Sequence, residues 1–99
     1  MIFEIAEIQI KPDSHAAFEA AVADAVPLFQ RARGCRSMRL EHGIEQADVY
    51  HLVVGWETLD DHVVHFRGSA DFQEWRRLVG AYFLVPPKVE HTQTVLTGF

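Results

Sequence analysis

The order of hydrophobic and polar positions along this chain predicts six elements of secondary structure. Alternation with a period of two is typical of strands, and apolar residues that recur every three or four positions are typical of helices. The pattern predicts four strands, at residues 2–11, 35–42, 48–56 and 89–96. It also predicts a long helix that begins at Asp13 and stops by Gly34, and two short helices at residues 58–66 and 69–79, which Gly68 separates.

This order of elements predicts the architecture. Strand, helix, strand, strand, interrupted helix, strand is typical of a ferredoxin-like α+β fold, βαββαβ, in which a four-stranded antiparallel sheet carries its helices on one face. No linker, repeat or low-complexity tract interrupts residues 1–99, so a single domain is expected. Asp13 is the expected N-cap of the long helix, Pro27 is expected to kink or shorten its last turn, and Thr58 is the expected cap of the next helix.

The third predicted strand is apolar on both of its faces. Val49 and Val53 point to one side, and four residues point to the other, namely Tyr50, Leu52, Val54 and Trp56. One layer of helices covers only one of these faces, and soluble monomers seldom expose a large apolar patch. The sequence therefore predicts a homodimer in which the uncovered face meets the same face of a second copy.

Composition excludes several classes of function. Nine Lys and Arg residues against fourteen Asp and Glu give a net charge of −5, and the basic residues are scattered, so nucleic-acid binding is not expected. The single cysteine, Cys35, excludes an intrachain disulfide and fits a reducing cytoplasm, where we expect the protein to reside. The apolar N-terminal run contains Glu4, Glu7 and Gln9 and has no basic leader, so neither a signal peptide nor a membrane span is expected.

Two polar residues on apolar helix faces, His62 and Arg76, are the first candidates for a functional site. At 3.6 residues per turn, each of them shares a face with apolar residues. These are Leu59, Val63 and Phe66 for His62, and Phe72, Trp75 and Val79 for Arg76. A buried charge without a partner is costly, so each polar group either has a buried partner or belongs to a ligand site.

Motifs spread over nearly the whole chain resemble a known family. They are Lys11, Pro12 and Phe18, then Gly34 and Cys35, then Trp56, Glu57 and Thr58, and finally His62, His65, Phe66, Ser69 and Phe72. Together they resemble the antibiotic biosynthesis monooxygenase family of the dimeric α/β-barrel superfamily. The resemblance implies a ferredoxin-like fold in a dimeric α/β barrel. It also implies kinship with cofactor-free oxygenases of phenolic and quinol substrates, haem-degrading enzymes and isomerases.

The resemblance implies roles for single residues as well. Trp56 matches the tryptophan with which oxygenases of the family shape the substrate cavity, and Arg76 falls near an arginine that some of them carry on the later helix. Leu52, four residues before Trp56, stands where these oxygenases have asparagine. Ala6 and Arg76 stand where the haem-degrading branch has its asparagine and its axial histidine, so haem degradation is disfavoured and no cofactor is expected.

Each candidate has an alternative. His62 is a candidate catalytic base, because a neutral imidazole can take a proton from a phenol and raise its electron density for reaction with oxygen. The alternative is a histidine hydrogen-bonded in the core or at the dimer edge. Arg76 is a candidate catalytic cation that holds an anionic ring oxygen or an enolate, and the alternative is an ion pair with Glu74 or Asp71. The expected walls of the substrate pocket are Trp56, Phe66, Phe72 and Trp75.

Other reactive side chains indicate no further chemistry. Asp61, His62 and His65 lie within one helical turn, but His65 points away from the apolar stripe and no further ligand follows at a known spacing, so no metal site is expected. Cys35 has no obvious histidine partner and is expected to be an inert buried thiol. No glycine-rich phosphate loop is present, which argues against a dinucleotide-binding fold.

Two functions from different classes remain. The first is a cofactor-independent monooxygenase of a small electron-rich aromatic, with a cavity between helices and sheet that His62 and Arg76 polarise. The second is a non-catalytic dimer that binds a small aromatic or lipid-like molecule. They differ in whether a proton acceptor faces the cavity.

Overall fold

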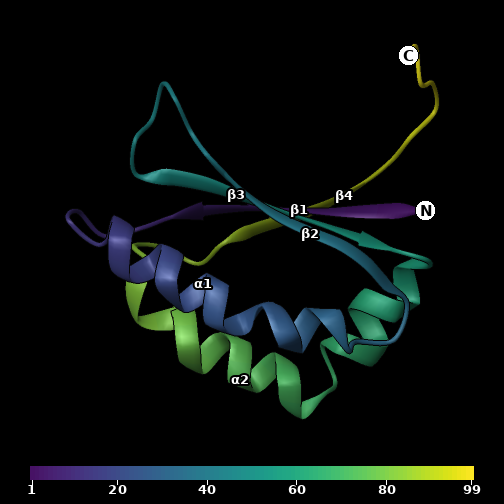
Figure 1. The fold of residues 1–99 in the computed structure, drawn as a ribbon, viewed down its shortest axis with the longest axis horizontal. Coiled ribbons are helices and arrows are strands. Elements are labelled where there is room, and N and C mark those ends of the chain that lie inside the picture. Colours follow the sequence, from purple (N-terminus) through teal and green to yellow (C-terminus); the bar gives the residue numbers. More distant parts are fainter.

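Four antiparallel strands form one sheet, and helices cover only one of its faces, in the computed structural model of residues 1–99 (Figure 1). The strands are β1 (Ile2–Gln9), β2 (Cys35–His42), β3 (Val49–Trp56) and β4 (Lys88–Gln93), in the spatial order β2-β3-β1-β4. The helices are α1 (His15–Gln30), the π-helix η1 (Asp61–Phe66), α2 (Ala70–Val79) and the short 3-10 helix η2 (Gly80–Tyr82). The predicted ferredoxin-like α+β fold is confirmed.

The hydrophobic core lies between the sheet and the helices. β1 and β3 pair so that Ala6 stands opposite Leu52, and both side chains are buried under the helices. Six buried residues come from α1, namely Phe18, Ala21, Val22, Ala25, Leu28 and Phe29. Two more, Trp75 and Val79, come from α2. Because strand side chains alternate, Glu4 lies on the same side of β1 as Ala6 and therefore faces this core.

The two ends of α1 differ from the expectation. Asp13 does not cap the helix, because its backbone has a φ of 63°, and Ser14 occupies the N-cap position instead. Asp tolerates this left-handed conformation better than most residues. Pro27 does not shorten the helix, which continues to Gln30. The burial of Phe29, which is 1% exposed, contributes roughly 1.5–3 kcal/mol and offsets the hydrogen bond that proline cannot donate.

The segment after β3 departs from an ideal α-helix. It forms a π-helix, whose turns are wider because its backbone hydrogen bonds span five residues, as between the Arg67 N–H and the His62 carbonyl at 3.0 Å. As a result Asp61 is buried, whereas Leu59 is 45% exposed. The predicted apolar face was therefore wrong at Leu59, although His62 and Phe66 are buried as expected.

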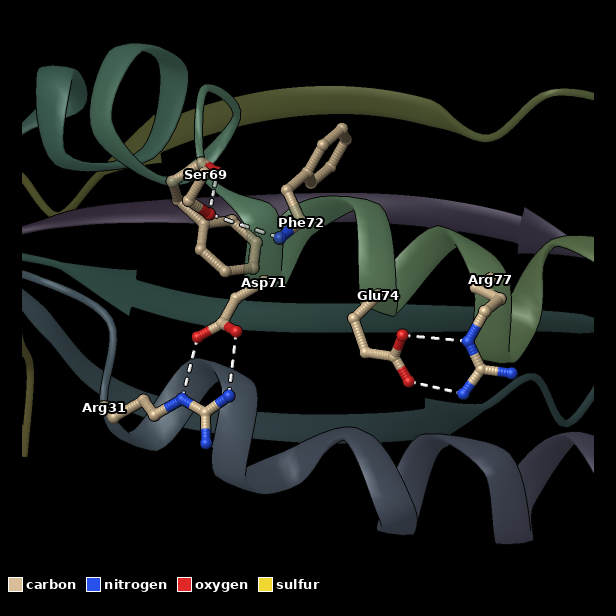
Figure 2. A network of polar contacts seen from close by, with 7 residues as sticks. Arg31, Ser69, Asp71, Phe72, Glu74 and Arg77 are labelled. Atoms are coloured by element: carbon tan, nitrogen blue, oxygen red, sulfur yellow. Dashed lines mark hydrogen bonds and ion pairs between the residues drawn. The ribbon is translucent and has the colours of Figure 1, made fainter.

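Hydroxyl groups cap both short helices: the predicted capping hydrogen bond of Thr58 is confirmed, and Ser69, expected only near the start of the second helix, is the N-cap of α2. The Thr58 hydroxyl oxygen accepts a hydrogen bond from the Asp61 N–H at 3.1 Å. Ser69 accepts one from the Phe72 N–H at 3.2 Å, as Figure 2 shows. These bonds satisfy backbone donors that the first turn of a helix leaves free.

The face of the sheet opposite the helices is uncovered (Figure 1). Its apolar residues, called here the open face, are Phe3, Ile5, Val49 and Val53. β4 ends at Gln93, earlier than predicted, and residues 94–99 extend away from the sheet with exposed side chains. None of the helices has the length and the apolar character that crossing a membrane requires.

Candidate active site

A carboxyl group is buried on the helix-facing side of the sheet. Glu4 on β1 is 6% exposed, and its Oε1 accepts a hydrogen bond of 3.1 Å from the indole N–H of Trp56 at the end of β3. The Nε2 atom of His62, on η1, lies 3.2 Å from the same oxygen. The Trp56 and His62 rings stack, with centroids 5.2 Å apart and 15° between their planes. Two strands and the π-helix thus meet at one carboxyl oxygen.

A second histidine extends this cluster toward the surface. β4 pairs with β1 so that His91 stands opposite Glu4, and the His91 Nε2 atom lies 2.8 Å from Nδ1 of His62. When His91 donates from Nε2, His62 accepts at Nδ1 and carries its own proton on Nε2, beside Glu4. His91 is half-buried, so the series Glu4, His62, His91 leads from the core toward the protein surface.

Burial sets the protonation states of these three groups. It raises the pKa of Glu4 to about 7, although the Trp56 hydrogen bond and the positive charge of Arg67 act in the opposite direction. Burial, together with Arg67 and His91, lowers the pKa of His62 to about 3. Burial and Arg67 also lower the pKa of His91. Near neutral pH the carboxyl is therefore the member of the series best suited to take up a proton.

A cavity of about 220 Å³ lies beside Glu4, between the sheet and α2. Its lining residues are Glu4, Ala6, Ile8, Leu52, His62, Arg67, Phe72, Trp75, Arg76, Phe83, Pro87 and Val89. The Oε2 atom of Glu4 has no hydrogen-bond partner, yet every fully buried side-chain nitrogen or oxygen in the protein has one. Oε2 is therefore accessible from the cavity, where it can meet a bound molecule.

The structure brings most of the sequence-predicted site residues to this cavity. Four of them line it, namely His62, Arg76, Phe72 and Trp75. Trp56 and Phe66 lie behind the lining, with their ring centroids 5.4 Å apart, and Trp56 has no exposed surface. These two rings support His62 from the core side instead of forming the cavity wall.

Arg76 forms no ion pair with Asp71 or Glu74, the two carboxylates that the sequence offered as its partners. Figure 2 shows Asp71 bound to Arg31, which directly follows α1, and Glu74 bound to Arg77, each through two hydrogen bonds. Arg76 forms no ion pair and lines the cavity. The alternative of an ion pair with Asp71 or Glu74 is therefore wrong.

Three residues of this site were not predicted from the sequence: Glu4, Arg67 and His91. The sequence contained a signal for Glu4. Glu4 lies two residues before Ala6 on the same strand, so both side chains point toward the core, where a carboxyl group is unusual. His91 could be placed only from the register of β4 against β1. Arg67 directly follows η1. Hydrophobic periodicity did not reveal that this segment forms the wider turns of a π-helix, so Arg67 could not be placed.

The remaining candidate groups stand apart from this cluster. No three His, Cys, Asp or Glu side chains are arranged to hold a metal ion, and His65 is exposed. Cys35 is half-buried at the start of β2, and burial raises the pKa of its thiol, which keeps it protonated and weakly nucleophilic.

Most of the site falls within the reach of a family model. The model described as antibiotic biosynthesis monooxygenase matches residues 1–78, which include Glu4, Trp56, His62 and Arg76. The chain belongs to the antibiotic biosynthesis monooxygenase family. In this family member His91 lies beyond the matched residues, so the surface end of the histidine series is outside the part that the family model describes.

Known proteins similar to this family member match it over nearly its full length. A crystal structure from Bordetella bronchiseptica, described as a candidate antibiotic biosynthesis monooxygenase, is 58% identical with a TM-score of 0.94, over 96% of this chain and 97% of that one. The uncharacterized protein YczJ of Bacillus subtilis is 38% identical over 95 residues, which cover 96% of this chain and 100% of YczJ. SnoaB, a cofactor-independent oxygenase from Streptomyces nogalater, shares the fold at 14% identity, with a TM-score of 0.82 over 98% of this chain and 95% of the SnoaB chain.

Proposed function

We propose that this protein is a cofactor-independent monooxygenase of a small electron-rich aromatic substrate, such as a phenol, a quinol or an anthrone. The observation that carries the proposal is the position of Glu4. A buried carboxyl group with a pKa of about 7 presents an unpaired oxygen to a largely apolar cavity. Such a group suits the removal of a proton from a weakly acidic substrate. Family membership supports oxygenase chemistry in this cavity.

In the proposed reaction the substrate ring lies against Phe72 and Trp75 and directs an acidic hydroxyl or methylene group at Glu4 Oε2. Glu4 takes the proton, and the resulting anion is electron-rich enough to react with O₂ directly. A carbon–oxygen bond forms, the peroxide receives the proton back from Glu4, and loss of water leaves a carbonyl group on the substrate carbon. The substrate supplies all the electrons that reduce O₂, so one oxygen atom enters the product, the other leaves as water, and no external reductant is needed.

His62 and His91 position Glu4 in this proposal. A pKa of about 3 makes His62 a weak base at neutral pH, which favours the neighbouring carboxyl as the acceptor of the substrate proton. The Trp56 N–H and the His62 imidazole hold Oε1 and leave Oε2 for the substrate. Proton exchange with solvent passes through the His62–His91 contact. Arg76, on the cavity wall, adds a positive charge to the site, which favours an anionic substrate.

We further propose that the protein functions as a homodimer through the open face. Ile5 and Val53 stand opposite each other on β1 and β3, and no helix covers them (Figure 1). Val53 is already only 5% exposed in the monomer, whereas Phe3, Ile5 and Val49 are half-buried, so a second copy on this face would bury the apolar surface that these three leave exposed. Membership of a family whose fold is a dimeric α/β barrel supports the same arrangement.

Oxygen uptake by the purified protein, freed of flavin and metal, tests the proposed reaction. We expect uptake with an anthrone or a quinol. Glu4→Gln keeps the size of the side chain and an acceptor for Trp56 but removes the base, so turnover should fall about 10²-fold or more. Glu45→Gln is the matched control, because Glu45 is exposed in the turn between β2 and β3 and lies outside the cavity.

Three outcomes would count against parts of this proposal. No oxygen uptake across a panel of phenols, quinols and anthrones, with and without a carboxylate group, would overturn the monooxygenase function. Saturable binding of the same compounds without reaction would support a non-catalytic dimer that binds small aromatic molecules. Equal turnover by Glu4→Gln and the wild type would remove Glu4 from the mechanism.

A further inference from the structure

Most arginines in this chain are paired with carboxylates, and the exceptions share one location. Five of the seven arginines form ion pairs, namely Arg31, Arg33, Arg36, Arg39 and Arg77. The other two, Arg67 and Arg76, form none, and both line the cavity beside Glu4. Carboxylates are not scarce, since the chain has fourteen Asp and Glu against nine Lys and Arg. Unpaired guanidinium groups are therefore concentrated at the candidate active site.

The cavity contains no carboxylate that could pair with Arg67 and Arg76. Its only carboxyl group is Glu4, whose Oε1 is already held by the indole and the imidazole described above. The guanidinium carbon of Arg76 lies 6.0 Å from the ring centroid of Phe72, so this group faces an aromatic ring and no carboxylate. Arg67 and Arg76 are exposed residues of the cavity lining, whereas Glu4 is buried, so the two arginines mark the solvent side of the cavity, called here its mouth.

We propose that the substrate carries a carboxylate in addition to its electron-rich ring, and that Arg67 and Arg76 bind this carboxylate at the mouth of the cavity. The inference deepens the proposed monooxygenase function and rests on it for the chemistry at Glu4. Guanidinium groups suit carboxylates because their N–H donors match the two oxygens and both partners are charged. A volume of about 220 Å³ is below the usual range for ligand sites, roughly 300–1,000 Å³, and limits the ring system to a compact one. The substrate class is therefore a hydroxylated aromatic carboxylic acid.

This arrangement gives the substrate one orientation. With its carboxylate at the exposed arginines, the ring extends inward along Phe72 and Trp75, and a hydroxyl group on the far side of the ring meets Glu4. The two arginines also counter the repulsion between an anionic substrate and a chain of net charge −5. A neutral phenol would leave both guanidinium groups without a partner.

Binding of matched ligands tests the proposal without any turnover. 6-Hydroxy-2-naphthoate and its carboxamide share the ring and the hydroxyl group and differ in charge, and 4-hydroxybenzoate with its carboxamide is a smaller pair. In anaerobic calorimetry at neutral pH, at least one acid should bind about 10-fold or more tightly than its amide. Arg67→Gln and Arg76→Gln should each weaken binding of that acid about 10-fold and change binding of the amide less than about twofold.

Arg77→Gln is the matched control. It removes the same charge one residue from Arg76, but its guanidinium pairs with Glu74 and does not line the cavity. Equal affinity for acid and amide, no binding of either acid, or an equal loss in Arg77→Gln would overturn the proposal. An acid preference that depends on both cavity arginines, in a protein that consumes no oxygen, would support the carboxylate site and overturn the monooxygenase activity alone.

Discussion

Nδ1 of His62 lies 2.8 Å from Nε2 of His91, although 29 positions separate the two residues in the sequence. The contact exists because β4 runs antiparallel to β1, which places His91 opposite Glu4, and because η1 buries His62 against the sheet. The pair of neutral imidazoles therefore connects the buried carboxyl group to the half-exposed edge of the site. Protonation of Glu4 can respond to solvent pH even though Glu4 itself is only 6% exposed.

The pH dependence of turnover should follow the ionisation of Glu4. Because the carboxylate form takes the substrate proton, kcat/KM should rise with pH and level off above a pKa of about 7. An oxygen-electrode profile from about pH 5 to about pH 9 measures this. Glu4→Gln should be slow at every pH and show no inflection there. An inflection that survives this substitution would belong to another group.

Trp56 should tune the pKa of Glu4. Its N–H donates to Oε1 at 3.1 Å and lowers the pKa of the carboxyl group. Trp56→Phe keeps an aromatic ring beside His62 but removes the donor, so the inflection of the rate profile should move to higher pH. Phe66→Leu, which changes the packing against the same indole, is the control and should lower the rate without moving the inflection. Equal inflections in both variants would limit Trp56 to a packing role.

Local periodicity was enough for the fold and for one wall of the cavity. Phe72, Trp75 and Arg76 could be grouped because α2 is a regular helix of ten residues with a serine cap. The grouping of Leu59 with His62 failed because it assumed 3.6 residues per turn in a segment that forms a π-helix. Nothing in hydrophobic periodicity distinguishes these two kinds of turn.

The rest of the site depends on contacts between distant strands. Glu4 could have been suspected from its core-facing position, but its meeting with His91 depends on the register between the first and the last strand. A shift of that register by one residue would turn His91 to the other face. The unpaired state of Arg67 and Arg76 likewise emerges only when every carboxylate near an arginine has been located.

The free energy of unfolding should depend on pH because Glu4 is buried. Its pKa is about 7 in the folded protein and 4.5 ordinarily, so between these values the folded state binds more protons and the free energy of unfolding falls as pH rises. His62 acts with the opposite sign, since its pKa falls from 6.5 to about 3 and its contribution is lost as pH falls.

A comparison of Glu4→Gln with the wild type isolates the carboxyl group, because the His62 contribution is common to both. Relative to the wild type, the variant should gain stability between about pH 5 and about pH 8, by an amount on the order of 1–3 kcal/mol. Urea unfolding at several pH values measures the difference. A constant difference would mean that Glu4 does not change its ionisation on folding.

The open face should hold a dimer together. Ile5→Lys places a charge in the proposed interface, where it has no partner, so the dimer should dissociate. Sedimentation equilibrium should then give twice the chain mass for the wild type and the chain mass for the variant. Val64→Lys adds the same charge at a position that is 54% exposed on η1, and it should remain dimeric. A monomeric wild type would refute this use of the open face.

Gly34 should be essential for the position of η1. Its φ is +74°, a conformation that favours glycine, and a Cβ atom there would lie 2.0 Å from Oδ2 of the buried Asp61. Gly34→Ala should therefore lower the free energy of unfolding by about 2 kcal/mol or more, and it should also reduce turnover because Asp61 is adjacent to His62. Gly80→Ala is the control, since its φ is −59° and nothing lies within 4 Å of the added atom, so stability should change by less than about 0.5 kcal/mol.

Gly34→Ala can impair the protein in two ways, through the clash of the added Cβ atom with Asp61 and through backbone strain at residue 34. Asp61→Ala in the Gly34→Ala background separates them. Recovery of turnover would assign the defect to the clash, and no recovery would assign it to the backbone strain.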